Sequence, residues 1–429
     1  MPVWGWALVV GLVCGLVGGL FRWSVAGTVS MISGFLQGLD APPLVGLASS
    51  IGISAFMVTA GFLLMRRIAP DTSGSGIPQI EGFLNGFLAL GGKRVVGVKF
   101  VSGVLVLGSG MVLGREGPTI QMGGGVAQWF AYKLRFIHEH GRILVAAGGA
   151  AGLAAAFGAP LSGVLFVMEE MKPTFKDPAF SYIAVVLACV MSIIGLELVY
   201  DSPALVVKVY EQIPYSSLWI FVLVGIGLGV IGFAFNQGLV ASLEFFSGIR
   251  NPWRRWIPAL VGGVVGALAW LFPATDGESP DLYHPMTGGG EQTIIWSLND
   301  NEATPVLIAL VAMRFGLTLL CYGSGAPGGI FAPMLSIAAL FSQAVARFFH
   351  ALFPSILSDP GTLVIAGMGG LVAATVGAPL TAIVLSLEIT RNYSLAIPVI
   401  TTAIIATLVT KLLGGGEIYT TLLGRMVMK

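Results

Sequence analysis

The stretch Gly114-Arg115-Glu116-Gly117-Pro118, with Leu113 before it and Thr119-Ile120-Gln121 after it, places a carboxylate between two glycines at the start of an apolar segment. Proline is favoured in the first turn of a helix, so we predict a helix N-terminus here. The unpaired N–H groups and partial positive charge of such an end attract anions. Glu116 therefore lies where a soluble anion would also bind.

The composition of the chain is that of a membrane protein with several spans. Of its 429 residues, 55% are hydrophobic and 10% are charged, whereas a soluble globular protein carries about 25% charged residues. A charged side chain at mid-bilayer costs at least ~2.5–3.5 kcal/mol and usually faces a cavity or a transport path, which singles out Glu116. The net charge of +1, with basic residues spread among loops rather than gathered in a patch, gives no indication of nucleic-acid binding, and we expect no such partner.

The cysteines and the N-terminal segment exclude a secreted, disulfide-rich protein. Cys14, Cys189 and Cys321 stand apart in apolar surroundings, so we expect buried thiols rather than disulfides or metal ligands. The first apolar segment, residues 3–21, has no charged region before it and no small-residue cleavage site. It predicts a membrane helix rather than a signal peptide. Residues 43–65, 182–198, 219–235 and 256–272 are further predicted spans.

Many of the other apolar segments are too short to cross a bilayer as a helix, which takes about 20 residues. The chain has 60 glycines and 23 prolines, and they bound runs such as 100–113, 143–157 and 161–168. Such runs predict broken or re-entrant helices around a protected cavity, as many transporters have. Close packing of helices through small residues is an alternative interpretation of the glycines.

An internal repeat organises the chain. The segment GGAAGLAAAFGAPLSGVLFVMEE at 148–170 matches GMGGLVAATVGAPLTAIVLSLEI at 367–389, and GREGP at 114–118 matches GIFAP at 329–333. Two related halves predict an all-α membrane fold with the substrate site between the repeats. We place the first repeat at residues 1–205 and the second at 206–429.

The repeat separates architectural carboxylates from functional ones. Glu169 and Glu388 occupy equivalent positions, so we predict that both are structural and accept hydrogen bonds at a helix end. We expect a residue that is present in both copies to support the fold, because the fold is what the two copies share. We expect a residue that is present in one copy only to have a specific role in function.

Glu116 and Glu170 are present in one copy only, where the other copy has Phe331 and Ile389. Both are therefore candidates for function. The structural alternative for Glu116 is a buried ion pair with Arg115. The alternative for Glu170 is a solvated side chain beside the charged connector that follows it.

Two glycine-rich turns offer donors to an anion. Gly74-Ser75-Gly76-Ile77-Pro78 exposes backbone N–H groups and one hydroxyl, and Gly328-Gly329-Ile330-Phe331 precedes the predicted helix that Pro333 starts. Weak, uncharged donors suit a transported ion, which must leave as readily as it enters. Glu81 and Lys99 are predicted to form a buried pair, because neither charge is tolerated alone in an apolar setting.

The charges of the loops predict which side of the membrane each loop faces. No Lys or Arg lies between Arg255 and Arg314, and the segment between them carries six acidic residues. The positive-inside rule places this acidic segment outside the cytoplasm and the basic loop 250–255 inside.

Four motifs in order resemble those of the CLC family of chloride channels and proton-coupled chloride transporters. They are GSGIP at 74–78, GREGP at 114–118, GIFAP at 329–333 and the isolated Tyr419 in GEIYTTLL. The resemblance extends from about residue 5 to residue 426. It implies a homodimer in the lipid bilayer, in which each subunit has its own pore made from two inverted halves of tilted, broken helices.

The resemblance also implies roles for residues. Glu116 would be the external gate, competing with chloride, and Glu170 would transfer protons on the inner side. Glu81 and Lys99 would be a buried pair near the proton route. The groups that would bind or surround chloride are Ser75, Tyr419, Ile330, Phe331, Gly329, Gly117 and Arg115.

The predicted function is exchange of chloride for protons across a bacterial inner membrane, with no enzymatic activity, cofactor or metal. Because the chain ends at Lys429, it resembles the compact prokaryotic members, and we expect no cytoplasmic regulatory domain. The resemblance also implies a preference for chloride over nitrate or fluoride, since Ser75 is the residue of the chloride branch. A passive chloride channel of the same fold is the main alternative, and a fluoride exporter is disfavoured. A serine hydrolase using Ser75 or Ser324 would need a base at membrane depth, and every histidine falls in or beside a connector.

Overall fold

The computed structural model describes residues 2–40, 42–136, 139–172, 175–200, 214–249, 253, 255–272, 286–299, 303–352 and 360–428. The described part is built from helices, and its only β pairing is an isolated bridge. His138, His284, five of the six acidic residues of the acidic segment and the boundary at 205/206 lie outside it. The division into two repeats at that residue stays a prediction.

The helices of the first half are α1 (Val3–Gln37), α2 (Pro43–Ile68), α3 (Ile77–Leu84), α4 (Gly92–Gly108), α5 (Glu116–Lys133), α6 (Glu139–Phe157), α7 (Pro160–Phe166) and α8 (Pro178–Glu197). Those of the second half are α9 (Leu218–Gly248), α11 (Ile257–Leu271), α12 (Glu291–Asn299), α13 (Thr304–Gly323), α14 (Phe331–Leu352), α15 (Gly361–Val376), α16 (Pro379–Thr390), α17 (Ala396–Leu412) and α18 (Ile418–Val427). A short π-helical segment, Val167–Met171, follows α7.

Eight helices of the described part are long and apolar enough to cross a membrane, so the chain is a multi-pass membrane protein. Several run beyond the predicted spans. Helix α1 has 35 residues, which at 1.5 Å per residue make about 52 Å. Since the hydrocarbon core is about 30 Å thick, such a helix crosses it tilted.

The predicted broken helices are confirmed at both Gly-Ala-Pro sequences. Helix α6 ends at Phe157 and α7 begins at Pro160, while α15 ends at Val376 and α16 begins at Pro379. In each case proline starts the second helix, where its missing N–H costs no intrahelical bond. Gly377 has φ +83°, a left-handed conformation that ends α15.

The two carboxylates assigned to architecture cap helices of the opposite repeat, as predicted. Glu388 of α16 accepts a hydrogen bond of 2.8 Å from the N–H of Ser162 in α7. Glu169, next to α7, accepts one of 2.8 Å from the N–H of Thr381 in α16. Each carboxylate also accepts the hydroxyl of the same residue. Because equivalent residues exchange equivalent bonds, a local two-fold axis relates the repeats.

A second reciprocal contact lies on this axis. Gly114 donates its N–H to the Gly329 carbonyl at 2.8 Å, and Gly329 donates to the Gly114 carbonyl at 2.7 Å, as an antiparallel bridge. The two glycines are equivalent positions of the matched GREGP and GIFAP stretches. The two stretches therefore run antiparallel where they meet, as inverted repeats require.

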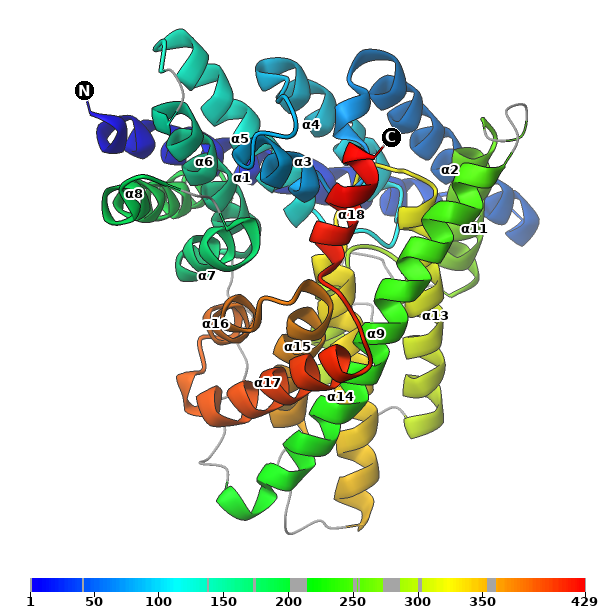
Figure 1. Ribbon diagram of the computed structural model, residues 1–429. Helices are drawn as coiled ribbons and strands as arrows, with labels where there is room; N and C mark the ends of the chain where they lie inside the picture. The colour runs from blue at the N-terminus through cyan, green and yellow to red at the C-terminus, as the bar shows by residue number, and fades with distance from the viewer. Residues whose placement is uncertain are drawn as a thin grey trace.

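The packing of the helices repeats in the same way. Helix α5 packs on α6 as α14 packs on α15, and α1 packs on α8 as α9 packs on α17. The halves also interlock, since α11 packs against α2 and α18 reaches α3 (Figure 1). Helices α3, α5, α14 and α18 contact one another in sequence, because α18 packs on α3, α3 on α5 and α5 on α14.

Candidate functional site

Glu116 begins α5 as predicted, but its side chain reaches a different helix. The residue is 0% exposed, and its Oε1 accepts a hydrogen bond of 2.7 Å from the N–H of Ala332. Ala332 is in the first turn of α14, where N–H groups have no intrahelical acceptor. The carboxylate therefore occupies an anion-binding position supplied by the other repeat. Its Oε2 makes no hydrogen bond within the part of the chain that the structure describes.

Glycines provide the space for this carboxylate. A Cβ atom added to Gly114 would lie 2.0 Å from Glu116 Oε1, and one added to Gly329 would lie 3.1 Å from the same atom. A Cβ atom on Gly117 would lie 2.6 Å from the Ser75 hydroxyl oxygen. These glycines of GREGP and GIFAP are therefore required, because Glu116 and Ser75 approach them closely. The two motifs lie at one location, together with Ser75.

The loop that carries Ser75 is held by a buried lysine. Ser75 is 1% exposed and precedes α3, in a loop whose carbonyls accept two hydrogen bonds from the ammonium of Lys99. These bonds measure 2.8 Å to the Thr72 oxygen and 2.7 Å to the Gly74 oxygen. The predicted pair of Glu81 with Lys99 is wrong, because loop carbonyls, not a carboxylate, satisfy the lysine. The Lys99 side chain thereby fixes the loop that carries Ser75.

The other predicted chloride ligands meet at the same place. Tyr419 and Phe331 are both 0% exposed, and their rings stack with centroids 6.0 Å apart and planes at 17°. The Tyr419 hydroxyl lies near the Ser75 side chain and completes no hydrogen bond within the described residues. Ile330 and Phe331 lead into α14, so their N–H groups lie at its N-terminus. Two hydroxyls and a helix N-terminus form a donor set that suits a small anion.

A second group of carboxylates is gathered around Glu170. Glu170 is 2% exposed, which contradicts the alternative of a solvated side chain, and neither of its oxygens is hydrogen-bonded within the described residues. It interacts electrostatically with Glu81, Glu417 and Lys172. Lys172 Nζ and Glu417 Oε2 form an ion pair of 3.0 Å, and Glu417 directly precedes α18, which carries Tyr419.

Two adjacent glutamates of the π-helical segment lie in different surroundings. Glu169 points to α16 and caps it, while Glu170 is turned into the interior. Consecutive side chains of a helix point in directions about 100° apart in the α form, so neighbouring glutamates reach different surroundings. Short π-helical segments are frequent at functional sites. Sequence reasoning found both residues through the repeat and did not predict the π-segment.

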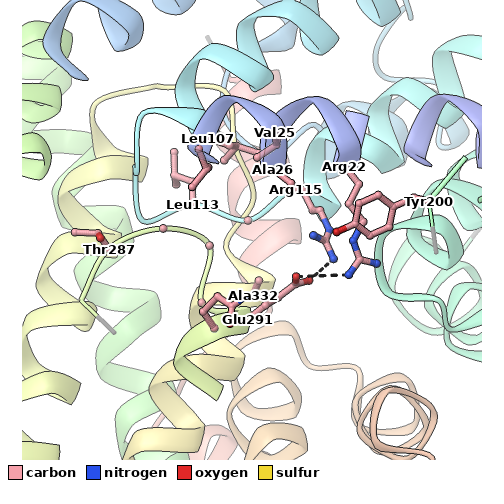
Figure 2. Close-up of a pocket in the computed structure, with 16 residues that line it drawn as sticks. Arg22, Val25, Ala26, Leu107, Leu113, Arg115, Tyr200, Thr287, Glu291 and Ala332 are labelled. Carbon is pink, nitrogen blue, oxygen red and sulfur yellow. Dashed lines mark hydrogen bonds and ion pairs between the residues drawn. The ribbon is translucent and has the colours of Figure 1, made fainter. Parts of the chain in front are cut away.

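A cavity of about 160 Å³ lies next to Glu116 (Figure 2). Its lining includes Gly114 and Ala332, which contact the Glu116 carboxylate. Figure 2 shows Glu291 at the wall of the cavity, with the guanidinium groups of Arg115 and Arg22 both directed to its carboxylate. Arg115 therefore pairs with Glu291, so the alternative of an Arg115–Glu116 ion pair is wrong.

The charges of the cavity are fixed by several contacts. Arg22 lies 3.8 Å from Glu291 and stacks over the Tyr200 ring, 4.6 Å from its centroid. Arg115 donates to the Ala156 carbonyl at 3.2 Å and 3.1 Å. Burial favours the neutral form of Glu291, but the guanidinium groups of Arg115 and Arg22 outweigh it and lower the pKa of Glu291 below its ordinary value of 4.5. Glu291 is ionised at neutral pH.

Three site residues escaped the sequence reasoning. Glu291 was counted only as part of the acidic segment, and Glu417 only as part of the Tyr419 motif. Arg22 directly follows the first predicted span, 3–21, and was assigned no role. The signal for Arg22 was its presence in an apolar segment, since such a charge needs a partner. The partner lies more than two hundred residues away in sequence, so no local pattern identified it.

The comparisons with known proteins agree with this geometry. The family model of voltage gated chloride channels matches residues 54–411. The chain belongs to this family, the CLC family. The H(+)/Cl(-) exchange transporter ClcA of Vibrio campbellii is 40% identical over 424 residues, covering 98% of this chain and 88% of that protein. The ClcA of Salmonella paratyphi B is 39% identical over 427 residues, covering 99% of this chain and 88% of that protein.

Solved CLC structures have the same fold. A slow cyanobacterial Cl-/H+ antiporter superimposes with a TM-score of 0.94 at 44% identity, covering 100% of this chain and 99% of that one. A CLC-type fluoride/proton antiporter superimposes with a TM-score of 0.73 at 18% identity, covering 96% and 95%. The predicted all-α CLC fold, with its inverted repeats of broken helices, is confirmed.

Proposed function

We propose that the chain exchanges chloride for protons across a membrane. The observation that carries this proposal is the hydrogen bond between the Glu116 carboxylate and the Ala332 N–H, 2.7 Å long, at the N-terminus of α14. A titratable carboxylate there occupies a position that also suits chloride. The curated relatives named as H(+)/Cl(-) exchange transporters, at about 40% identity along nearly the whole chain, support the same activity.

The exchange follows from one position serving two ions. Ionised Glu116 fills the outer position and excludes chloride from it. Burial favours the protonated acid, whereas the helix N-terminus favours the ionised one, so the balance between the two states is close enough to shift. Protonated Glu116 no longer competes as an anion and swings away, and chloride enters. When chloride leaves, the carboxylate releases its proton and returns.

The inner part of the mechanism assigns the remaining predicted residues. Ser75, Tyr419 and the N–H groups of Ile330 and Phe331 bind the central chloride in this proposal. Glu170 delivers protons from the inner side. It is buried without a hydrogen-bonding partner among the described residues, and the ion pair of Lys172 with Glu417 lies beside it.

The experiment uses the purified chain in liposomes loaded with chloride and diluted into low chloride, with the membrane voltage held near zero. Chloride leaving down its gradient should draw protons inward, against a proton gradient set beforehand. The measurement is the external pH with a glass electrode, together with chloride efflux. Chloride efflux with no proton movement would overturn the proposal and identify a passive channel instead.

We further propose that the functional unit is a homodimer with one pore per subunit in a bacterial inner membrane. Helices α8 and α17 each expose a row of aliphatic side chains, including Ile183, Val190, Ile400 and Leu408. These rows pack against lipid or a second copy. Light scattering in detergent that gives a monomer mass would contradict the dimer.

A further inference from the structure

We propose that the cavity outside Glu116 is a third anion site, beyond the central position and the Glu116 position, which takes a small monovalent anion such as chloride between Arg22 and Arg115. In this proposal the Glu291 carboxylate is a tethered competitor for the same site. The inference rests on the proposed function for the identity of its ligand. It adds a binding site that an anion reaches before the exchange position. Of the two arginines of this site, only Arg115 belongs to one of the four family motifs.

The cavity carries a net positive charge. Two guanidinium groups and one carboxylate converge there, so the group carries a net charge of +1 at neutral pH. The side chains of Arg22 and Arg115 are 13% and 17% exposed, which reduces screening by water. A cavity wall with net positive charge in a low-dielectric setting concentrates small anions.

The guanidinium groups of Arg22 and Arg115 are held in place as hydrogen-bond donors. Tyr200 stacks under Arg22, and the Ala156 carbonyl accepts from Arg115, so both guanidinium groups are held toward one point. That point is occupied by the Glu291 carboxylate (Figure 2). A carboxylate bridging two preoriented guanidinium groups marks an anion position in the same way that Glu116 marks the position at α14.

The cavity adjoins the position that the Glu116 carboxylate occupies. The cavity is lined by Gly114 and Ala332 as well as by the two arginines. Ala332 is the residue whose N–H holds Glu116. An anion released from the arginines therefore meets the Glu116 position next. Glu291, whose side chain is 35% exposed, keeps the outer site from holding the anion too tightly to release it.

The test is bromide bound to crystals of Glu291→Gln, located by anomalous scattering. The amide keeps the shape and removes the competing charge. We expect an anomalous peak within hydrogen-bonding distance of both guanidinium groups, and about tenfold tighter half-saturation by external chloride in flux measurements, as expected for removing one charge a few ångströms from the ion. The matched control is Arg22→Gln combined with Glu291→Gln, which should lose the peak.

Absence of bromide from the cavity of Glu291→Gln would overturn the inference. If that variant does not fold, flux measurements on Arg22→Gln test the site instead. The external chloride concentration for half-saturation should rise several-fold in Arg22→Gln. An unchanged concentration would contradict the site. The outcome is separate from that of the proposed function. Proton pumping without the extra bromide refutes only the outer site, and the extra bromide without proton pumping refutes only the exchange.

Discussion

Single buried charges in this protein are stabilised by backbone groups of segments far away in sequence. Glu116 accepts the N–H of Ala332, and Lys99 donates to the carbonyls of Thr72 and Gly74. Neither side chain pairs with the oppositely charged residue that the sequence suggested, which was Arg115 for Glu116 and Glu81 for Lys99. A backbone group carries no charge to be neutralised, so the carboxylate keeps its ability to leave, which a tight ion pair would remove.

At the residue scale, Gly114→Ala should disrupt coupling. The added Cβ would lie 2.0 Å from Glu116 Oε1, so the carboxylate must leave the Ala332 N–H. We expect the number of protons moved per chloride to fall strongly, with a loss of stability of about 1–3 kcal/mol from overpacking. The control is Gly97→Ala in α4, where nothing lies within 4 Å of the added atom. An unchanged proton-to-chloride ratio in Gly114→Ala would refute the assigned carboxylate position.

Glu291 provides a second prediction at this scale, on stability against pH. Its pKa is lowered in the folded protein from the ordinary 4.5. Its ion pairs therefore stabilise the fold fully above pH 4.5 and progressively less as the pH falls through the lowered value. Glu291→Gln should melt at a lower temperature than the unchanged protein at neutral pH, and the difference should shrink in acid. A difference that grows in acid would contradict the assigned pairing.

At the element scale, the reciprocal caps hold the broken helices of the two repeats together. Glu169→Ala and Glu388→Ala each remove the acceptor for two N–H groups and one hydroxyl of the opposite helix. Each should cost about 1 kcal/mol, within the 0.5–2 kcal/mol of helix caps, and the two losses should be similar. Thermal unfolding in detergent measures them. Glu197→Ala, at an exposed site, is the control, and melting temperatures no lower than that control's would rule out the capping role.

The sequence predicted the elements that a local pattern or the repeat can identify. The Gly-Ala-Pro breaks, the start of α5 at Glu116 and the capping pair were all predicted, because proline and the duplication leave marks in the sequence. The lengths of α1 and α9 were underestimated, because the predicted spans 3–21 and 219–235 end directly before Arg22 and Asn236, and both helices continue past these polar residues. The partners of Arg115 and Lys99 were not predicted, because contacts between segments distant in sequence leave no local pattern.

At the scale of the whole molecule, the predicted topology is testable because the three native cysteines are buried. They should not react with a membrane-impermeant maleimide, so single introduced cysteines report the side. Gln292→Cys, in the wall of the outer cavity, should be labelled in intact cells. Arg255→Cys, in the basic loop, should be labelled only after the membrane is opened. The reverse pattern would invert the assigned orientation.

The central claim is that the Glu116 carboxylate and chloride take turns at one position at the start of α14. The most direct measurement compares Glu116→Gln with the unchanged protein in the liposome assay, recording chloride efflux and proton movement together. The amide cannot carry the proton, so we predict that chloride efflux continues while proton movement driven by chloride disappears. Proton uptake that persists in Glu116→Gln would contradict the account.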